Sequence, residues 1–178
     1  MGGRGCLPNE PWEQAVSRDD DRSEVYAAEL SAVGGTTLEQ QVPLRELHDA
    51  AAAIVASAWW PTGPVAIRSA RSDARSSRAQ DRGDQVEIRL AAGQHDMATL
   101  IHELAHALAG TAAGHGPIFR AAHLDLMSLM AQPADVEWLR LAYAAHGLKV
   151  GERRWEQPPP ATGEPSVDGR DARGRFVL

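Results

Sequence analysis

The sequence predicts an α+β fold, in which a small sheet of about three strands packs against several helices. Residues 86–90 alternate between apolar and charged side chains, as a half-buried strand does. Residues 96–109 instead repeat apolar side chains at intervals of three and four residues, which is typical of an amphipathic helix. The length of 178 residues suits one domain with tails.

Both ends of the chain differ in composition from its middle. Residues 1–21 are rich in glycine, proline and charge and would bury little surface, so we expect a mobile leader. Trp12 is the one side chain there that could hold the segment against the domain. Residues 150–178 contain three consecutive prolines and scattered polar residues, which predicts a disordered tail. The domain should therefore span residues 22–149.

The first half of this domain should hold the sheet. Residues 24–30 are predicted as a short strand, and residues 65–70 and 86–90 as two further strands. We expect a solvated hairpin loop between the last two, because aspartates are interleaved with its arginines. Residues 43–58 are predicted as a helix with a buried stripe of Leu44, Leu47, Ala51, Ile54, Val55 and Ala58.

The last part of the domain should be helical. Residues 117–131 are apolar nearly all round, which predicts a buried helix. Its polar exceptions are His123, which we expect to be a satisfied core histidine, and Asp125, which could orient a ligand imidazole. Residues 133–146 form the last predicted helix, with Tyr143 in the core rather than at a reacting group.

The helix predicted at residues 96–109 carries the sequence HELAH. His102 and His106 lie one turn apart on the same face, so both imidazoles can bind a single ion. Neutral imidazole is a good ligand for Zn2+, at about 2.0–2.1 Å. Glu103 is rotated by about 100° from His102, because a helix has about 3.6 residues per turn. Its carboxylate therefore lies beside the metal, where it can accept a proton from a water that the metal activates.

A third ligand is predicted at His115. Gly110 and Gly114 end the helix, and the chain can then turn back towards the histidine pair. The single cysteine, Cys6, lies in the leader and cannot compete for the metal. A three-histidine site with an open fourth position is therefore the simplest assignment. The alternative is that these histidines are ordinary surface or core residues of an amphipathic helix.

The helix motif and the segment around His115 together resemble the signature of a known protein group. HELAH at residues 102–106, followed by GHGPIF at residues 114–119, resembles the signature of SprT-like zinc metallopeptidases, in which a histidine in an H-G-x-x-F context follows HExxH. Within that group, the chain is most similar to a family of small actinobacterial proteins described as metallohydrolases. Those proteins carry similar stretches at residues 22–29 and 139–148. The resemblance thus spans residues 22–149.

This resemblance implies a zincin-like domain that binds Zn2+ through His102, His106 and His115, with Glu103 as the general base. In such peptidases an edge strand just before the metal helix pairs with the backbone of the substrate, a general mode of peptide binding. The resemblance implies that residues 86–90 have this role. It does not imply a particular substrate.

Charge and composition limit the partners. The formal net charge of -6 gives no global attraction to nucleic acid or to an anionic membrane. Five arginines between Arg68 and Arg82 could still form a local basic patch for phosphate. The sequence shows neither a signal peptide nor an apolar run that would span a membrane, and one cysteine gives no disulfide framework, so we expect a cytoplasmic protein.

The sequence therefore predicts a zinc-dependent hydrolase, in the first place a metallopeptidase that acts on a peptide or protein. Glu103 would take a proton from the attacking water and return it to the leaving amine. Two alternatives remain. One is a DNA-associated protease of the SprT-like type that uses the segment from Arg68 to Arg82. The other is a non-catalytic module stabilised by zinc, although a purely structural site needs no base and usually fills its fourth position.

Overall fold

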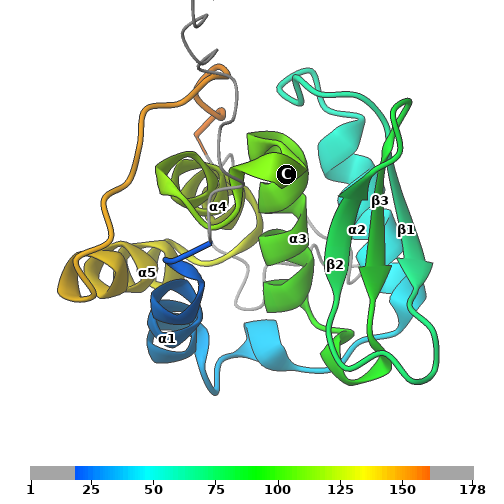
Figure 1. Cartoon of the computed structure of the whole chain (residues 1–178), viewed down its shortest axis with the longest axis horizontal. Coiled ribbons are helices and arrows are strands. Elements are labelled where there is room, and N and C mark those ends of the chain that lie inside the picture. Colours follow the sequence, from blue (N-terminus) through cyan, green and yellow to red (C-terminus); the bar gives the residue numbers. More distant parts are fainter. Residues whose placement is uncertain (1–18, 161–178) are drawn as a thin grey trace, which may run out of the picture.

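The computed structural model describes residues 19–160 and confirms the α+β class, with a three-stranded mixed sheet and five α-helices in that range (Figure 1). None of the helices among these residues is long and apolar enough to cross a bilayer. The elements follow the chain as α1 (Arg22–Val33), α2 (Leu44–Val55), β1 (Val65–Ser69), β2 (Arg78–Asp81), β3 (Val86–Leu90), α3 (Met97–Ala109), α4 (Pro117–Met130) and α5 (Pro133–Ala145), with short 3-10 turns at Thr37–Glu39, Ala92–Gln94 and Thr111–Ala113.

The sheet has the order β1-β3-β2. β3 pairs with β1 in parallel, with Val65 opposite Val86, and with β2 in antiparallel, with Ala79 opposite Ile88. The predicted alternation of β3 is confirmed, since Ile88 and Leu90 are fully buried. This apolar face of the sheet packs against helices.

The central helix of the domain is α3, which lies between the sheet and α4 (Figure 1). It is buried on nearly all sides, with Leu100, Ile101 and Leu104 fully inaccessible. α1 packs along α5 on the far side, and α2 covers β1. A helix enclosed in this way holds the side chains of its motif in a fixed setting.

The ends of α3 are determined by local interactions. The Asp96 side chain accepts a hydrogen bond of 2.7 Å from the Thr99 backbone N–H, which caps the first turn. Gly110 ends the helix with φ +90°, a conformation that a residue with a side chain rarely adopts. The next long helix, α4, begins at Pro117 in the favoured first position.

The strand predicted at residues 24–30 is wrong, because these residues form part of α1. Val25, Ala28 and Ala32 are buried at intervals of three and four residues, and this face packs against α5. A strand would have buried alternate residues instead. The side chains of α1 are small and of mixed polarity, so the helical period is hard to recognise in the sequence.

The loop expected between β1 and β3 contains the strand β2. Its four residues include one apolar side chain, Ala79, so no alternation was visible. β2 is a strand because its main chain pairs with β3, and not because its own side chains favour a strand. As a consequence β3 has neighbours on both sides, and the expectation that residues 86–90 are an edge strand is wrong.

The structure describes part of each predicted tail, and both described parts contact the domain. In residues 150–160, the Gly151 N–H donates to the Pro117 carbonyl at 2.9 Å and the Trp59 indole donates to the Glu156 carbonyl at 2.8 Å. At the other end, Asp19 and Asp21 contact the domain. Trp12 and residues 161–178 lie outside the described range.

Candidate metal centre

The centre is built first from two imidazoles on α3. The ring centroids of His102 and His106 lie 5.0 Å apart, as expected for residues one helical turn apart on the same face. Phe119, in the first turn of α4, packs against both rings, at 5.0 Å from His102 and 4.4 Å from His106. Phe119 is fully buried, so it forms an apolar support on which the rings rest.

The third imidazole arrives through the turn after α3. The short 3-10 turn ends at Gly114, whose φ of +54° reverses the chain. His115 follows, and its ring lies 4.7 Å from His106 and 4.9 Å from Phe119, measured between centroids. One ligand nitrogen from each of His102, His106 and His115 lies within 4.8 Å of the other two. The predicted three-histidine cluster is therefore present.

The geometry of these rings fits a bound cation. The Nε2 atoms of His102 and His115 lie 3.2 Å apart. Two Zn–N bonds of about 2.0–2.1 Å in tetrahedral geometry would separate the nitrogens by roughly 3.3–3.4 Å. The Nδ1 atoms of the same rings face carboxylates of Glu29 and Asp19, so each Nδ1 holds a proton and donates. Both Nε2 atoms would then present lone pairs to each other, an arrangement that a shared cation or proton makes favourable.

The three rings differ in their charge states. Burial, followed by the charges of the neighbouring histidines, lowers the pKa of His106 to about 2. Burial also lowers the pKa of His115. Burial lowers the pKa of His102 as well, but the charge and hydrogen bond of Glu29 outweigh it, so that its pKa is raised. His106 and His115 are thus neutral at neutral pH, whereas Glu29 favours the positively charged form of His102.

Glu103 lies beside the cluster and is not one of the three residues that could hold a metal. It is 5 % exposed, and its Oε2 atom has no hydrogen-bond partner among the described residues. Burial raises the pKa of this carboxyl from 4.5 to about 7, against the opposing charge of His102 and a hydrogen bond from the Ala79 backbone. A carboxyl that titrates near neutral pH and retains a free oxygen is suited to accept a proton.

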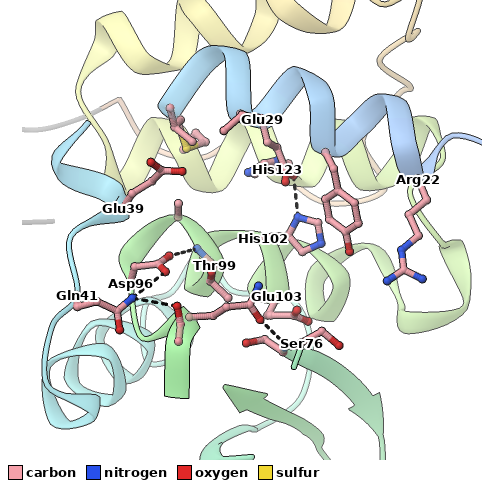
Figure 2. A pocket seen from close by; sticks show the side chains of 18 residues that line it. Arg22, Glu29, Glu39, Gln41, Ser76, Asp96, Thr99, His102, Glu103 and His123 are labelled. Carbon is pink, nitrogen blue, oxygen red and sulfur yellow. Dashed lines mark hydrogen bonds and ion pairs between the residues drawn. The ribbon is translucent and has the colours of Figure 1, made fainter. Parts of the chain in front are cut away.

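A cavity of about 540 Å³ opens beside Glu103 and His102 (Figure 2). α1 forms one wall, with Arg22 and Glu29 on the same side of the cavity, and the loop before β2 contributes Ser76. His106 and His115 do not line this cavity. A small or extended molecule in the cavity would therefore meet Glu103 and the His102 side of the cluster.

Three residues near the cluster were not found from the sequence. The Tyr26 ring stacks on His102, with centroids 5.5 Å apart, and the carboxylates of Glu29 and Asp19 accept hydrogen bonds from the Nδ1 atoms of His102 and His115. The helical period of α1 would have placed Tyr26 and Glu29 near one face, had it been recognised. Nothing in the local sequence marks Asp19.

The other polar residues of α4 do not join the cluster. His123 is 3 % exposed and its Nδ1 lies 2.7 Å from the Tyr143 hydroxyl, so both are satisfied core residues, as the sequence predicts. Burial lowers the pKa of His123 to about 4. The suggestion that Asp125 orients a ligand is wrong. It accepts two hydrogen bonds from Arg153, at 2.6 and 2.7 Å, and one from the Trp155 indole.

The arginines between Arg68 and Arg82 do not form a uniform basic patch. Glu87 on β3 forms ion pairs with Arg68 at 3.4 Å, Arg82 at 2.8 Å and Arg89 at 2.8 Å. Hydrogen bonds from Arg82 and Arg89 lower the pKa of Glu87 to about 2. The carboxylate thus offsets part of the positive charge on this outer face of the sheet.

Comparison with known proteins adds no relative. No protein-family model matches the chain, and searches against curated proteins and against solved structures gave no match either. What the protein does is therefore inferred from the two motifs and from the geometry of the centre.

Proposed function

We propose that the protein is a zinc-dependent hydrolase, and that its substrate is a peptide. One observation carries this proposal: a buried carboxylate with a free oxygen, Glu103, stands next to three converging imidazoles and at the wall of a cavity. The resemblance of HELAH and GHGPIF to the SprT-like signature supports the same function, and with it a zincin-like interpretation of the fold.

The donor set favours Zn2+ over other common ions. Three neutral imidazoles with an open fourth position are typical of catalytic zinc sites, whereas Mg2+ and Ca2+ prefer oxygen ligands. His102, His106 and His115 would hold the ion. Bound zinc would polarise the scissile carbonyl and lower the pKa of the attacking water.

The residues of the chain then have distinct roles in hydrolysis. Glu103 accepts the proton of the attacking water through its free oxygen and passes it to the leaving amine. Its raised pKa, about 7, allows both steps near neutral pH. Tyr26 and Arg22 line the same cavity, and the Arg22 guanidinium lies 5.4 Å from the Tyr26 ring centroid. Burial raises the pKa of Tyr26, so its hydroxyl stays protonated and can donate to a substrate oxygen on which negative charge develops.

The edge strand that would pair with a peptide is β2 rather than β3. β2 is at one end of the strand order, and it packs next to α3. The Ala79 backbone on β2 hydrogen-bonds to Glu103, so this edge of the sheet faces the proposed base. A peptide in extended conformation could bind along β2 by main-chain hydrogen bonds.

A peptide-library digest tests the proposal. The zinc-loaded protein and its Glu103→Gln variant are incubated with the same complex peptide mixture, and new termini are identified by mass spectrometry. Cleavage by the wild type that is absent in the variant is expected. Equal peptide patterns from the two proteins, both with zinc bound, would indicate the non-catalytic zinc module instead.

A further inference from the structure

Two carboxylates from outside the motif helix hold the imidazoles of the centre. We infer that Glu29 on α1 and Asp19 just before α1 are positioning residues, which fix His102 and His115 and set the affinity for the metal. The segment that precedes and begins the domain is then part of the metal centre. The inference rests on the proposed ligand set, but it holds whether or not the centre is catalytic.

Glu29 acts on His102. Its Oε1 atom lies 2.7 Å from Nδ1 of His102 and 3.3 Å from Nδ1 of His123 (Figure 2). His123 is in turn held by the Tyr143 hydroxyl at 2.7 Å. The Glu29 side chain is 17 % exposed, and a carboxylate so far removed from water requires hydrogen-bond donors. The buried network behind Glu29 therefore fixes its position, and Glu29 fixes the ring of His102.

Asp19 acts on His115 through both of its oxygens. Oδ1 accepts a hydrogen bond of 3.0 Å from the His115 backbone N–H, and Oδ2 accepts one of 2.5 Å from Nδ1 of the ring. A Cβ atom at Gly114 would lie 3.1 Å from Oδ1 of Asp19. Glycine at this position therefore serves the close approach of Asp19 as well as the turn.

A second link ties the same segment to the same loop. The Arg120 guanidinium, which is 2 % exposed in the domain, donates to the Asp21 carboxylate at 2.7 Å and to the His115 carbonyl at 2.8 Å. Its Nε atom donates to the Lys149 carbonyl at 2.8 Å. Arg120 thus joins residues 19–21, the His115 loop and the chain after α5 at one buried point.

The effect of these contacts is to aim both Nε2 atoms at one point. A carboxylate on Nδ1 selects the tautomer with a free Nε2 and prevents the ring from rotating. It also increases the basicity of the ligand. The separation of 3.2 Å between the two Nε2 atoms is the result. Removal of such an outer carboxylate typically costs about 10–100-fold in metal affinity.

The chain offers matched controls. Glu24 lies on the same helix as Glu29 and also binds a histidine, His146, at 2.8 Å, but this pair is outside the cluster. Asp20 is an exposed neighbour of Asp19. Glu24→Gln and Asp20→Asn therefore change the same charge in nearly the same place without touching a ligand.

The test is a zinc competition titration of the full chain against a chromophoric chelator. Variants Glu29→Gln, Asp19→Asn and Asp19→Ala are compared with both controls. Zinc affinity should fall about 10–100-fold for Asp19→Ala, and by a smaller factor for Glu29→Gln and Asp19→Asn, each of which keeps an acceptor oxygen. The controls should bind zinc as the wild type does. The absorption spectrum of bound Co2+ should change for Asp19→Ala and Glu29→Gln, because the ligand geometry relaxes.

The outcomes separate this inference from the proposed function. If the wild type binds zinc and both Glu29→Gln and Asp19→Ala bind it equally tightly, the positioning role is wrong while the ligand set stands. If the wild type does not bind zinc, the ligand set fails and the inference with it. Should Glu29→Gln fail to fold, Asp19→Ala decides alone, because the Asp19 side chain is 33 % exposed and its removal leaves no large cavity.

Discussion

His102 and His115 are 13 residues apart in the chain, and their Nε2 atoms face each other at 3.2 Å. A helix end, a 3-10 turn and a glycine with positive φ produce this approach, and carboxylates on the opposite ring nitrogens maintain it. The contact is compatible with a metal centre, because two imidazole lone pairs repel unless a cation or a proton lies between them. The first three of the following predictions test what the centre does, and the other two test contacts elsewhere in the domain.

His115→Ala should lower zinc content strongly, whereas His123→Ala should keep one zinc per folded protein. His115 supplies a ligand nitrogen to the cluster, and His123 instead binds Tyr143 in the core. Metal analysis of both purified variants measures the difference. Retention of zinc by His115→Ala together with its loss in His123→Ala would show that the third ligand is wrongly assigned.

Glu103→Gln should keep zinc and thermal stability near the wild-type values and lower the rate of hydrolysis by about 10²–10⁴-fold. The amide keeps the volume and one acceptor oxygen but cannot take a proton at neutral pH. Steady-state rates on a cleaved peptide from the library measure the effect. Loss of zinc in this variant would mean that Glu103 is a ligand, and full activity would mean that another group is the base.

Tyr26→Phe should lower kcat about 10-fold or more, with KM and zinc content little changed, as expected on removal of one donor to a developing oxyanion. The phenylalanine ring can keep the stacking on His102, 5.5 Å between centroids, so the cluster should not be disturbed. Kinetics on the same peptide, with zinc measured in parallel, give the result. An increase in KM alone would assign Tyr26 to substrate binding only.

Arg153→Ala should lower the free energy of unfolding by about 1–3 kcal/mol, because it leaves the buried carboxylate of Asp125 without its two-bonded partner. Arg154→Ala, one position further along an exposed stretch, is the control and should have little effect. Urea unfolding of both variants provides the comparison. Equal stability of the two would mean that the contact between Arg153 and Asp125 does not stabilise the domain.

Glu87→Gln should remove an acid-dependent part of the stability. The pKa of Glu87 is lowered from 4.5 to about 2 in the folded protein, first by the hydrogen bond from Arg82. The stabilisation is therefore fully present above pH 4.5 and is lost as the pH falls towards about 2. Wild type should be the more stable protein at neutral pH, and the difference should vanish at the acid end and shrink in high salt. A pH-independent difference in urea unfolding would contradict this.

The parts of the molecule that depend on interactions within a few residues along the chain could be predicted from the sequence. The spacing of His102 and His106 needs only helical geometry, and the helix needs only its apolar period and the Asp96 cap. The return of the chain to His115 is encoded by glycines whose positive φ is a property of single residues. For the same reason the helices after residue 96 and the strand β3 were predicted where they lie.

Other parts depend on contacts outside each element and emerged only in the folded domain. Glu29 and Asp19 meet their histidines across 73 and 96 residues, and no local pattern marks a carboxylate for such a contact. β2 became a strand through pairing with β3, although its own side chains carry no strand signal. Asp125 binds Arg153 instead of a histidine, because a bidentate guanidinium satisfies a buried carboxylate better than one imidazole does. The contacts of Glu29, Asp19 and Asp125 are strengthened by the low dielectric of the interior, which exists only once these segments pack together.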